Sequence, residues 1–255
     1  MFIRRALRMI VVCGLVAALI APVTLHADDD ALTPAQREAV EKIVRETIVK
    51  HPEIILEAVQ SLQQQRKDEQ VAQQKSALAQ HRKALMDDQD SMVIGNPKGD
   101  VTVVEFFDYR CPYCKQMEPA IQATLKEDGK VRLMLKEYPI LGEDSVLASR
   151  AAIASRKQGK YMAFHDALMR TKGVFTPDVI KLVAKEVGLD VARLEKDMAD
   201  PAVDQIIRAN QAIADSLGIE GTPGFVIGDR VISGGMPLPQ FRTLISDART
   251  GCATC

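Results

Sequence analysis

The spacing of apolar and polar residues divides the chain into three stretches. An apolar run from Met9 to about Val23 follows three arginines at the start. Residues 28–93 then carry apolar side chains at helical spacing and contain no glycine, cysteine or aromatic residue. From residue 94 onward, short β-branched runs and helical patterns are separated by glycine and proline. The pattern predicts an export segment, a helical extension and a mixed α/β domain.

Residues 1–27 have the layout of a secretory signal peptide. Arg4, Arg5 and Arg8 precede the apolar run, and small residues before Ala27 predict cleavage after that residue. A retained membrane anchor is the alternative, but the run is shorter than the roughly 20 residues that a spanning helix needs. We therefore expect export to the periplasm.

Residues 28–93 predict two helices. Thr33 and Gln36 form a capping-box pattern around Pro34, and His51-Pro52 ends the first helix. Arg66 interrupts the heptad spacing of the second helix, so a long coiled coil is not indicated. Two interpretations stay open: a solvated connecting helix, or an oligomerisation stalk that buries its apolar stripe against copies of itself. The stripe consists of Val40, Ile43, Val44, Ile48, Ile55 and Val59.

The second module, residues 94–255, begins at the turn-rich stretch 94–100. Residues 101–107 and 131–138 predict two strands, joined by a helix that opens at Cys111 and ends before Gly129. A block of capped helices follows at about 145–217, and then a β-hairpin around Gly228-Asp229 and a final helix at 239–247. This order predicts an α/β or α+β domain with an inserted helical block.

Charge and cysteine content restrict the function. The formal net charge of −1 becomes −4 once the three arginines of residues 1–27 are removed, which argues against a nucleic-acid partner. The exported chain keeps four cysteines as two close pairs, Cys111 with Cys114 and Cys252 with Cys255. A chain of this length needs no disulfide to hold its core together, so the pairs require a chemical explanation.

The first pair has the position of a redox site. With Cys111 at the helix N-cap and Pro112 at the first helical position, the free amides of Tyr113 and Cys114 point toward the Cys111 sulfur. These donors and the helix dipole lower a cysteine pKa from about 8.5 to roughly 3.5–7.5. Cys111 is thus the expected nucleophile, and Cys114 is expected to resolve the mixed disulfide.

A metal site is the alternative for this pair. Zinc would need two further ligands, and the only candidates are the second cysteine pair or His51, His81 and His165, none of them in a paired spacing. The strand before the pair and the helix after it favour redox chemistry, so we expect no bound metal and no cofactor. For Cys252 and Cys255 a small local disulfide is favoured over a shuttle or metal role.

At these residues the sequence resembles the DsbA-like proteins of the thioredoxin superfamily, and among them the ScsC-type periplasmic proteins with an N-terminal helical extension. The resemblance rests on VVEFFDYRCPYC, GIEGTPGFVIG, the helical insertion between them and HPEIILEAV. It implies a thioredoxin fold with an inserted helical domain. It also implies that Glu105 is an acid buried beneath the disulfide, that Pro223 is a cis-proline beside the sulfurs, and that Thr222 pairs with the substrate backbone.

The charged residues of the two predicted strands and the residues near the cysteines can also be interpreted from their chemistry. Glu105 is the one charge in an apolar strand, and burial would raise its pKa and let it exchange protons with Cys114. Lys136, in the next strand, is expected to be solvated, with pairing to Glu105 as the alternative. Pro112 and Tyr113, the intervening pair, are expected to contact substrate together with Thr222 and Pro223.

The resulting function hypothesis is a periplasmic thiol–disulfide oxidoreductase acting on exported proteins. Pro-Tyr provides no imidazole to stabilise the Cys111 thiolate, so a moderate oxidant or a disulfide isomerase is favoured over a strong oxidase. Expected partners are a membrane-bound thiol reductase or oxidase and further copies of the chain. The alternatives are a monomeric dithiol oxidase and a copper-binding protein, since ScsC-type relatives are linked to copper tolerance and thiolates suit Cu(I).

Overall fold

The computed structural model describes residues 32–251, so the signal-peptide prediction and the Cys252–Cys255 pair lie outside the described residues. The chain divides into two compact units with the boundary between Ser61 and Leu62.

The helices of the described part are α1 Pro34–Lys50, α2 Glu53–Met86, α3 Pro112–Asp128, α4 Glu143–Ser155, the 3₁₀ turn η1 Arg156–Gln158, α5 Tyr161–Arg170, α6 Pro177–Glu186, α7 Val191–Met198, α8 Pro201–Ser216 and α9 Leu238–Thr250. The strands are β1 Met92–Gly95, β2 Val101–Phe107, β3 Val131–Glu137, β4 Gly224–Ile227 and β5 Arg230–Ser233.

The first unit consists of α1 and the beginning of α2. The predicted capping box is present, because the Thr33 hydroxyl accepts from the Gln36 amide and the Gln36 side chain accepts from the Thr33 amide. No residue of α1 is buried, so the apolar stripe predicted to be buried faces solvent in the single chain. Its exposed members include Val40, Ile43, Val44, Ile48, Val49, Ile54, Ile55, Leu56 and Val59.

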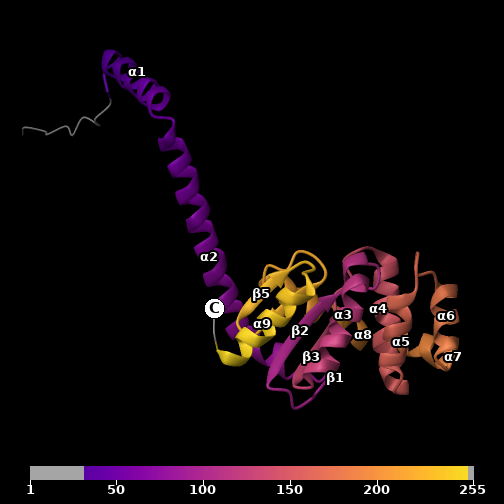
Figure 1. Ribbon diagram of the computed structural model, residues 1–255. Coiled ribbons are helices and arrows are strands. Elements are labelled where there is room, and N and C mark those ends of the chain that lie inside the picture. Colours follow the sequence, from indigo (N-terminus) through magenta and orange to yellow (C-terminus); the bar gives the residue numbers. More distant parts are fainter. Residues whose placement is uncertain (1–31, 252–255) are drawn as a thin grey trace, which may run out of the picture. The chain divides into compact units, whose positions relative to one another are not determined.

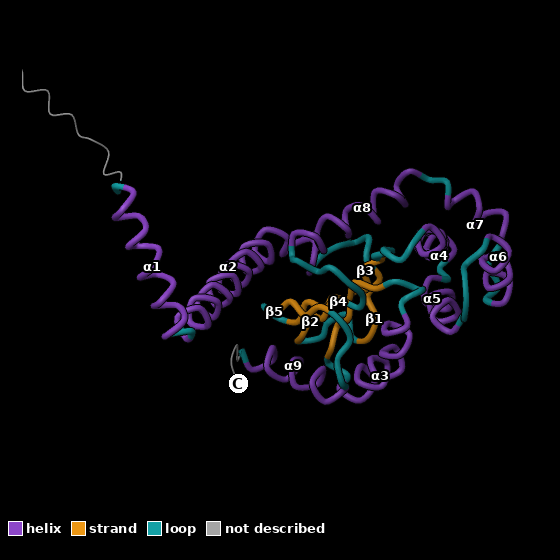
Figure 2. The backbone as a smooth tube through the Cα atoms, turned by 90° about the horizontal axis from the view of Figure 1, so that it is seen from above, coloured by secondary structure: helices purple, strands orange, loops and turns teal. Residues whose placement is uncertain are grey.

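The second unit is built on a five-stranded sheet of order β1-β3-β2-β4-β5 (Figures 1 and 2). The central pair β2 and β3 is parallel, as expected for a strand–helix–strand crossover through α3, and the other neighbours are antiparallel. The predicted hairpin is confirmed as β4 and β5. The edge strand β1 was not predicted, because four half-exposed residues carry too little pattern.

Each face of the sheet is covered by helices. The odd-numbered positions of β2, such as Val103 and Phe107, face the core that includes residues of α3, α5 and α9. The even-numbered positions, Val104 and Phe106, face a second core built with α8 and the end of α2. Because successive strand side chains point to opposite faces, this alternation fixes which residues lie beneath α3.

The second half of α2 belongs to this second core. Ala77 is 7% exposed and Leu85 is fully buried against the sheet face described above. Gln74 also donates a hydrogen bond to the Leu217 carbonyl at 3.1 Å. Several of the sparse apolar residues after residue 70, which we included in the 28–93 extension, therefore pack in the core of the second unit.

Lys136 corrects a sequence expectation. It is 1% exposed rather than solvated, and its ammonium pairs with the carboxylate of Asp88. Lys136 lies opposite Phe106 in the register, whereas Glu105 lies opposite Leu135. The lysine therefore shares the α2 and α8 face with Phe106, and pairing with Glu105 on the other face is geometrically excluded.

Helices α4 to α8 form the inserted block between β3 and β4; Figure 2 shows α4 to α7 at one side of the sheet and α8 running back along it. Helix α4 packs against α5, α6, α7 and α8 and so forms the centre of the block. The predicted fold class, an α/β domain with a helical insertion and an N-terminal helical extension, is confirmed. None of the helices in the described range is both long and apolar enough to cross a membrane.

Candidate active site

Cys111 occupies the N-cap of α3, as the sequence predicted. Its Sγ accepts the Cys114 amide at 3.5 Å, and Pro112 is at the first helical position. In the thiol form, Cys111 Sγ donates to the Thr222 carbonyl oxygen at 3.0 Å. The thiolate form is therefore stabilised from the helix and lies against the loop that carries Pro223.

The pKa values of the two cysteines move in opposite directions. The hydrogen bond from the Cys114 thiol, helped by Thr222 and the amides of Cys114 and Tyr113, lowers the pKa of Cys111 to about 6. Burial, together with that same hydrogen bond, raises the pKa of Cys114 far above its ordinary value. At neutral pH the pair thus holds one proton, with a thiolate on Cys111 and a thiol on Cys114.

Glu105 lies beneath this pair, on the odd-numbered face of β2. It is 1% exposed, and its Oε2 has no hydrogen-bond partner among the described residues. Burial raises the pKa of Glu105 well above its ordinary value, and the charges of Glu118 and Cys111 raise it further. The charge of Glu105 in turn raises the pKa of Cys114, so the carboxyl and the thiol are electrostatically coupled.

The loop before Cys111 is organised by Asp108, which the sequence analysis did not single out. Its buried carboxylate accepts from the amides of Arg110, Ile140 and Leu141 at 2.7–3.0 Å and from the Ser145 hydroxyl at 2.7 Å. One carboxylate thereby fixes the turn into α3 against the start of the helical insertion. An aspartate three residues before the helix N-cap was the available sequence signal.

Lys115 is a second residue that the sequence analysis missed. Its ammonium donates to the carbonyls of Leu168, Met169 and Thr171 at 2.5–3.2 Å, at the C-terminal end of α5. It also lies 5.3 Å from the centre of the Phe175 ring. A cation at the negative end of a helix dipole ties α5 to the active-site helix.

The loop opposite Cys111 contains the cis peptide bond Thr222-Pro223. The Pro223 carbonyl accepts from the Gly234 amide at 2.8 Å, which joins this loop to the segment after β5. Tyr113 is 62% exposed beside the sulfurs. The structure therefore brings Pro112, Tyr113, Thr222 and Pro223 around Cys111.

An adjacent groove runs along the exposed side of α3. Its lining is largely apolar and comes from α3 and the segment before α9: Tyr113, Gln116, Met117, Ala120, Gly235, Met236, Pro237 and Leu238. The Met236 amide donates to the Met117 sulfur at 3.3 Å and holds the two walls together. An extended apolar peptide segment could lie here next to Cys111.

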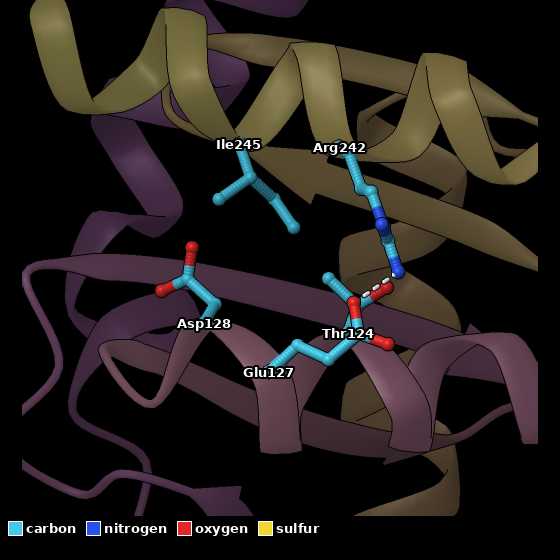
Figure 3. Close-up of a pocket in the computed structure, with 5 residues that line it drawn as sticks. All are labelled: Thr124, Glu127, Asp128, Arg242 and Ile245. Carbon is cyan, nitrogen blue, oxygen red and sulfur yellow. Dashed lines mark hydrogen bonds and ion pairs between the residues drawn. The ribbon is translucent and has the colours of Figure 1, made fainter.

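A second hollow lies at the far end of α3 and is shown in Figure 3. There the Arg242 guanidinium of α9 donates to Glu127 of α3 at 2.5 Å, with Thr124, Asp128 and Ile245 around them. The ion pair already satisfies its two charged groups, and the place is remote along α3 from Cys111. We assign no chemistry to it.

Within residues 32–251, Cys111 and Cys114 belong to no group of three or more metal-ligand side chains. The two cysteines are free thiols. The geometry on α3 is that of a dithiol that exchanges with disulfides, because a thiolate, a resolving thiol and a buried carboxyl lie together.

The fold and this pair define the chain as a thioredoxin-fold protein with a dithiol site of the thiol–disulfide oxidoreductase type. The chain belongs to the DSBA-like thioredoxin domain family, which matches residues 102–246. Residues 36–69 match a second family, the copper resistance protein ScsC N-terminal domain.

Solved structures agree with this assignment. A thioredoxin-like oxidoreductase from Silicibacter pomeroyi DSS-3 is 46% identical, with a TM-score of 0.65, and the match covers 66% of this chain and 98% of that one. A linker-deletion mutant of Proteus mirabilis ScsC is 30% identical with a TM-score of 0.65, covering 87% and 98% of the two chains.

Curated relatives overlap the chain less completely. A probable disulfide bond formation protein D from Bacillus anthracis is 27% identical over 59% of this chain and 73% of its own length. The chain also matches Na⁺/H⁺ antiporters of Salinispora arenicola and Salinispora tropica, and it spans about a quarter of the length of each.

Proposed function

We propose that this chain is a periplasmic thiol–disulfide oxidoreductase that exchanges disulfides in exported proteins, with isomerisation favoured over net oxidation. The observation that carries the proposal is the pair of opposed cysteine pKa values at the α3 N-terminus, about 6 for Cys111 and far above the ordinary value for Cys114. At neutral pH Cys111 is therefore a nucleophilic thiolate, and Cys114 is a thiol that can resolve the mixed disulfide.

The reaction begins when the Cys111 thiolate attacks one sulfur of a substrate disulfide. The substrate S–S bond breaks, a Cys111–substrate mixed disulfide forms, and the other substrate sulfur leaves as a thiolate. In isomerisation, a different substrate thiolate attacks the substrate sulfur of the mixed disulfide. The Cys111–substrate S–S bond breaks, a new substrate disulfide forms and the Cys111 thiolate is released, so the protein undergoes no net redox change. If rearrangement stalls, Cys114 attacks Cys111, and the substrate leaves reduced while Cys111 and Cys114 become a disulfide.

Glu105 has a proton-transfer role in this scheme. When Cys114 attacks, its thiol proton must leave, and Glu105 is the coupled carboxyl beneath it that can accept the proton in its ionised form. The released proton returns by the same route when the disulfide is reduced again. A membrane-bound thiol reductase would restore the dithiol, whereas a membrane-bound oxidase would drive the protein toward oxidation.

Substrate binding is assigned to the surface around Cys111. The Thr222 backbone pairs with an extended substrate segment, Pro112, Tyr113 and Pro223 contact it, and the groove along α3 receives its apolar side chains. An unfolded exported protein exposes both backbone and apolar residues, so such a site recognises many sequences.

The exposed stripe on α1 and early α2 supports self-association. Val44 is 49% exposed and Ile43 is 62% exposed in the single chain, and a stripe of this kind is stabilised when a second copy covers it. The match of residues 36–69 to the ScsC N-terminal domain agrees with a distinct role for this part of the chain. Periplasmic location is supported by a solved relative described as a periplasmic thioredoxin-like protein from Salmonella enterica.

The experiment compares insulin reduction with refolding of a scrambled-disulfide substrate. Cys111→Ser is expected to abolish both activities. Ile43→Glu is expected to lower the mass measured by light scattering and to reduce refolding while insulin reduction persists. The matched control Lys42→Glu introduces the same side chain at an exposed polar neighbour and should change neither measurement.

Refolding that survives Cys111→Ser would contradict the oxidoreductase proposal as a whole. Full isomerase activity in an Ile43→Glu protein shown to be monomeric would instead contradict only the role of the stripe. The two failures are therefore distinguishable.

Copper binding is the second candidate, favoured by the description of the ScsC N-terminal family as a copper resistance protein. The Cys111 and Cys114 thiolates would be soft ligands for Cu(I). A Cu(I) titration of the reduced protein and of Cys111→Ser tests it, and equal binding by the two proteins would rule out this site.

A further inference from the structure

A cluster of three metal-ligand side chains lies between α3 and α5, apart from the sulfurs. Glu118 comes from α3, and His165 and Asp166 come from α5. One ligand atom from each side chain lies within 4.8 Å of the others, and His165 Nε2 lies 3.9 Å from Glu118 Oε1. The disulfide-exchange scheme uses none of these three residues.

A buried hydrogen-bond network determines the tautomer of His165. The hydroxyls of Tyr109 and Tyr161 both donate to Glu137 Oε1, at 3.0 and 2.7 Å. Since the Tyr109 proton is used there, its oxygen is free to accept from His165 Nδ1, which lies 3.0 Å away. The ring is fully buried, and a buried imidazole is favoured in its neutral form. With the proton on Nδ1, Nε2 carries a bare lone pair.

That lone pair has no partner. The His165 side chain is fully buried, and Nε2 makes no hydrogen bond to any described residue, although it faces Glu118. Glu118 accepts one hydrogen bond, from Gln122 Nε2 at 2.7 Å. Apart from that amide, the cluster presents one imidazole nitrogen and two carboxylates, all acceptors, to a common point.

Both carboxyls of the cluster are partly withdrawn from solvent and lie beside the fully buried imidazole. Two desolvated carboxyls beside an unprotonated imidazole are stabilised together when a cation binds between them.

We infer that Glu118, His165 and Asp166 bind a divalent transition-metal cation of the zinc class. Three protein ligands of imidazole and carboxylate type leave the fourth tetrahedral position for water. The imidazole favours such a cation over Mg²⁺ and Ca²⁺, which prefer oxygen, and the absence of sulfur from the set disfavours Cu(I).

The surroundings fit this assignment. The Tyr109–Glu137 pair holds the imidazole by its other nitrogen, which is the usual support of a histidine ligand. Zinc–ligand distances of about 2.1 Å put neighbouring ligand atoms about 3.4 Å apart. The 3.9 Å between His165 Nε2 and Glu118 Oε1 needs only a small adjustment, and the three ligand atoms, all within 4.8 Å of one another, come together by rotation of the carboxylate side chains. Glu118 keeps 14% of its side chain exposed and Asp166 is half-buried, which gives the ion a route from solvent.

The experiment uses the full mature chain in its oxidised, thiol-free state, because free cysteines would bind zinc themselves. Equilibrium dialysis against zinc chloride, with metal analysis, measures ions bound per chain and their affinity. One zinc ion per chain is expected, and Glu118→Gln and Asp166→Asn should each weaken its binding at least tenfold. Glu186→Gln, at an exposed carboxylate of α6, is the matched control and should leave binding unchanged.

The carboxamide variants are the principal test because they keep the side-chain shapes. His165→Gln should also abolish binding, but this residue is buried, so circular dichroism must first show that the variant is folded. Absence of zinc binding by the oxidised protein would overturn the inference. Affinity that is unchanged in both Glu118→Gln and Asp166→Asn would overturn it as well, by placing the ion elsewhere, for example at His51 or His81.

Discussion

At the scale of single residues, the main feature is the asymmetry between two cysteines on one turn of helix. Cys111 at the N-cap receives hydrogen bonds that favour its thiolate, while Cys114, one turn into the helix, is held as a thiol by burial. The sequence predicted the position of Cys111, because the N-cap and Pro112 are local features. It could not predict Lys115 or Tyr109, whose partners lie 28 to 56 residues away in the chain.

The reactivity of Cys111 should follow its lowered pKa. Its alkylation rate by iodoacetamide, measured by mass spectrometry of the Cys111 peptide, should rise with pH around a midpoint near 6. Cys114→Ala removes the largest stabilising hydrogen bond and should move this midpoint upward. A midpoint near 8.5, the value of an ordinary cysteine, would contradict the assignment.

The same shift makes the stability of the reduced protein depend on pH. A depressed folded-state pKa stabilises the fold fully above the unfolded pKa of about 8.5, and this contribution disappears as the pH falls through about 6.

Glu105→Gln should slow the release of substrate from the mixed disulfide. The amide keeps the shape of the side chain but cannot accept the Cys114 proton, and loss of a general base costs about 100-fold in rate. Rapid-quench measurement of the mixed disulfide would report this step. Formation of the mixed disulfide should be nearly unaffected, and Glu69→Gln, an exposed carboxylate on α2, should alter neither step. An unchanged release rate in Glu105→Gln would remove Glu105 from the mechanism.

At the scale of elements, successive side chains of β2 and β3 point to opposite faces of the sheet, and this decides which residues can act together. The sequence predicted these strands and the β4–β5 hairpin, since their patterns are local. It did not reveal that Glu105 and Lys136 lie on opposite faces, because the face depends on the register between the strands. The Asp88–Lys136 ion pair could not be predicted from the sequence either, since it joins residues that are 48 positions apart.

Asp88→Asn should destabilise the protein by about 2–3 kcal/mol, because it leaves the buried Lys136 ammonium without its counter-charge. Urea unfolding of the oxidised protein measures this loss. Asp87→Asn, at the exposed neighbouring position, is the control and should change stability by less than about 0.5 kcal/mol. Adding Lys136→Met to Asp88→Asn should recover most of the loss. Equal stability of Asp88→Asn and Asp87→Asn would show that the pair is not structural.

At the scale of the whole molecule, the chain combines a unit of exposed helices with a unit that has its own core. The boundary between Ser61 and Leu62 falls within α2, so one helix contributes to both units. The sequence indicated the extension through its composition, but it did not show where the extension stops and the second core begins. Ala77 and Leu85 are the only buried residues of α2, and two residues do not form a detectable pattern.

Truncation tests this division. A chain starting at residue 62 should keep the thermal midpoint of the second unit, whereas a chain starting at residue 94 loses Leu85, Asp88 and part of β1. The loss of Leu85 alone should cost about 2–5 kcal/mol and lower the midpoint clearly. Calorimetry of the two oxidised proteins is the measurement. Equal midpoints would mean that the end of α2 adds nothing to the core.

The position of Tyr113 has a spectroscopic consequence. The chain contains no tryptophan, so its intrinsic ultraviolet fluorescence comes from its four tyrosines. Tyr109, Tyr138 and Tyr161 are at most 4% exposed, whereas Tyr113 stands at the surface between the two active-site cysteines. We expect most of the emission change on opening of the Cys111–Cys114 disulfide to come from this ring, and Tyr113→Phe should remove most of it. Thiol exchange can then be followed in real time without an attached dye, and Tyr113→Phe, which keeps the other three tyrosines, is the control.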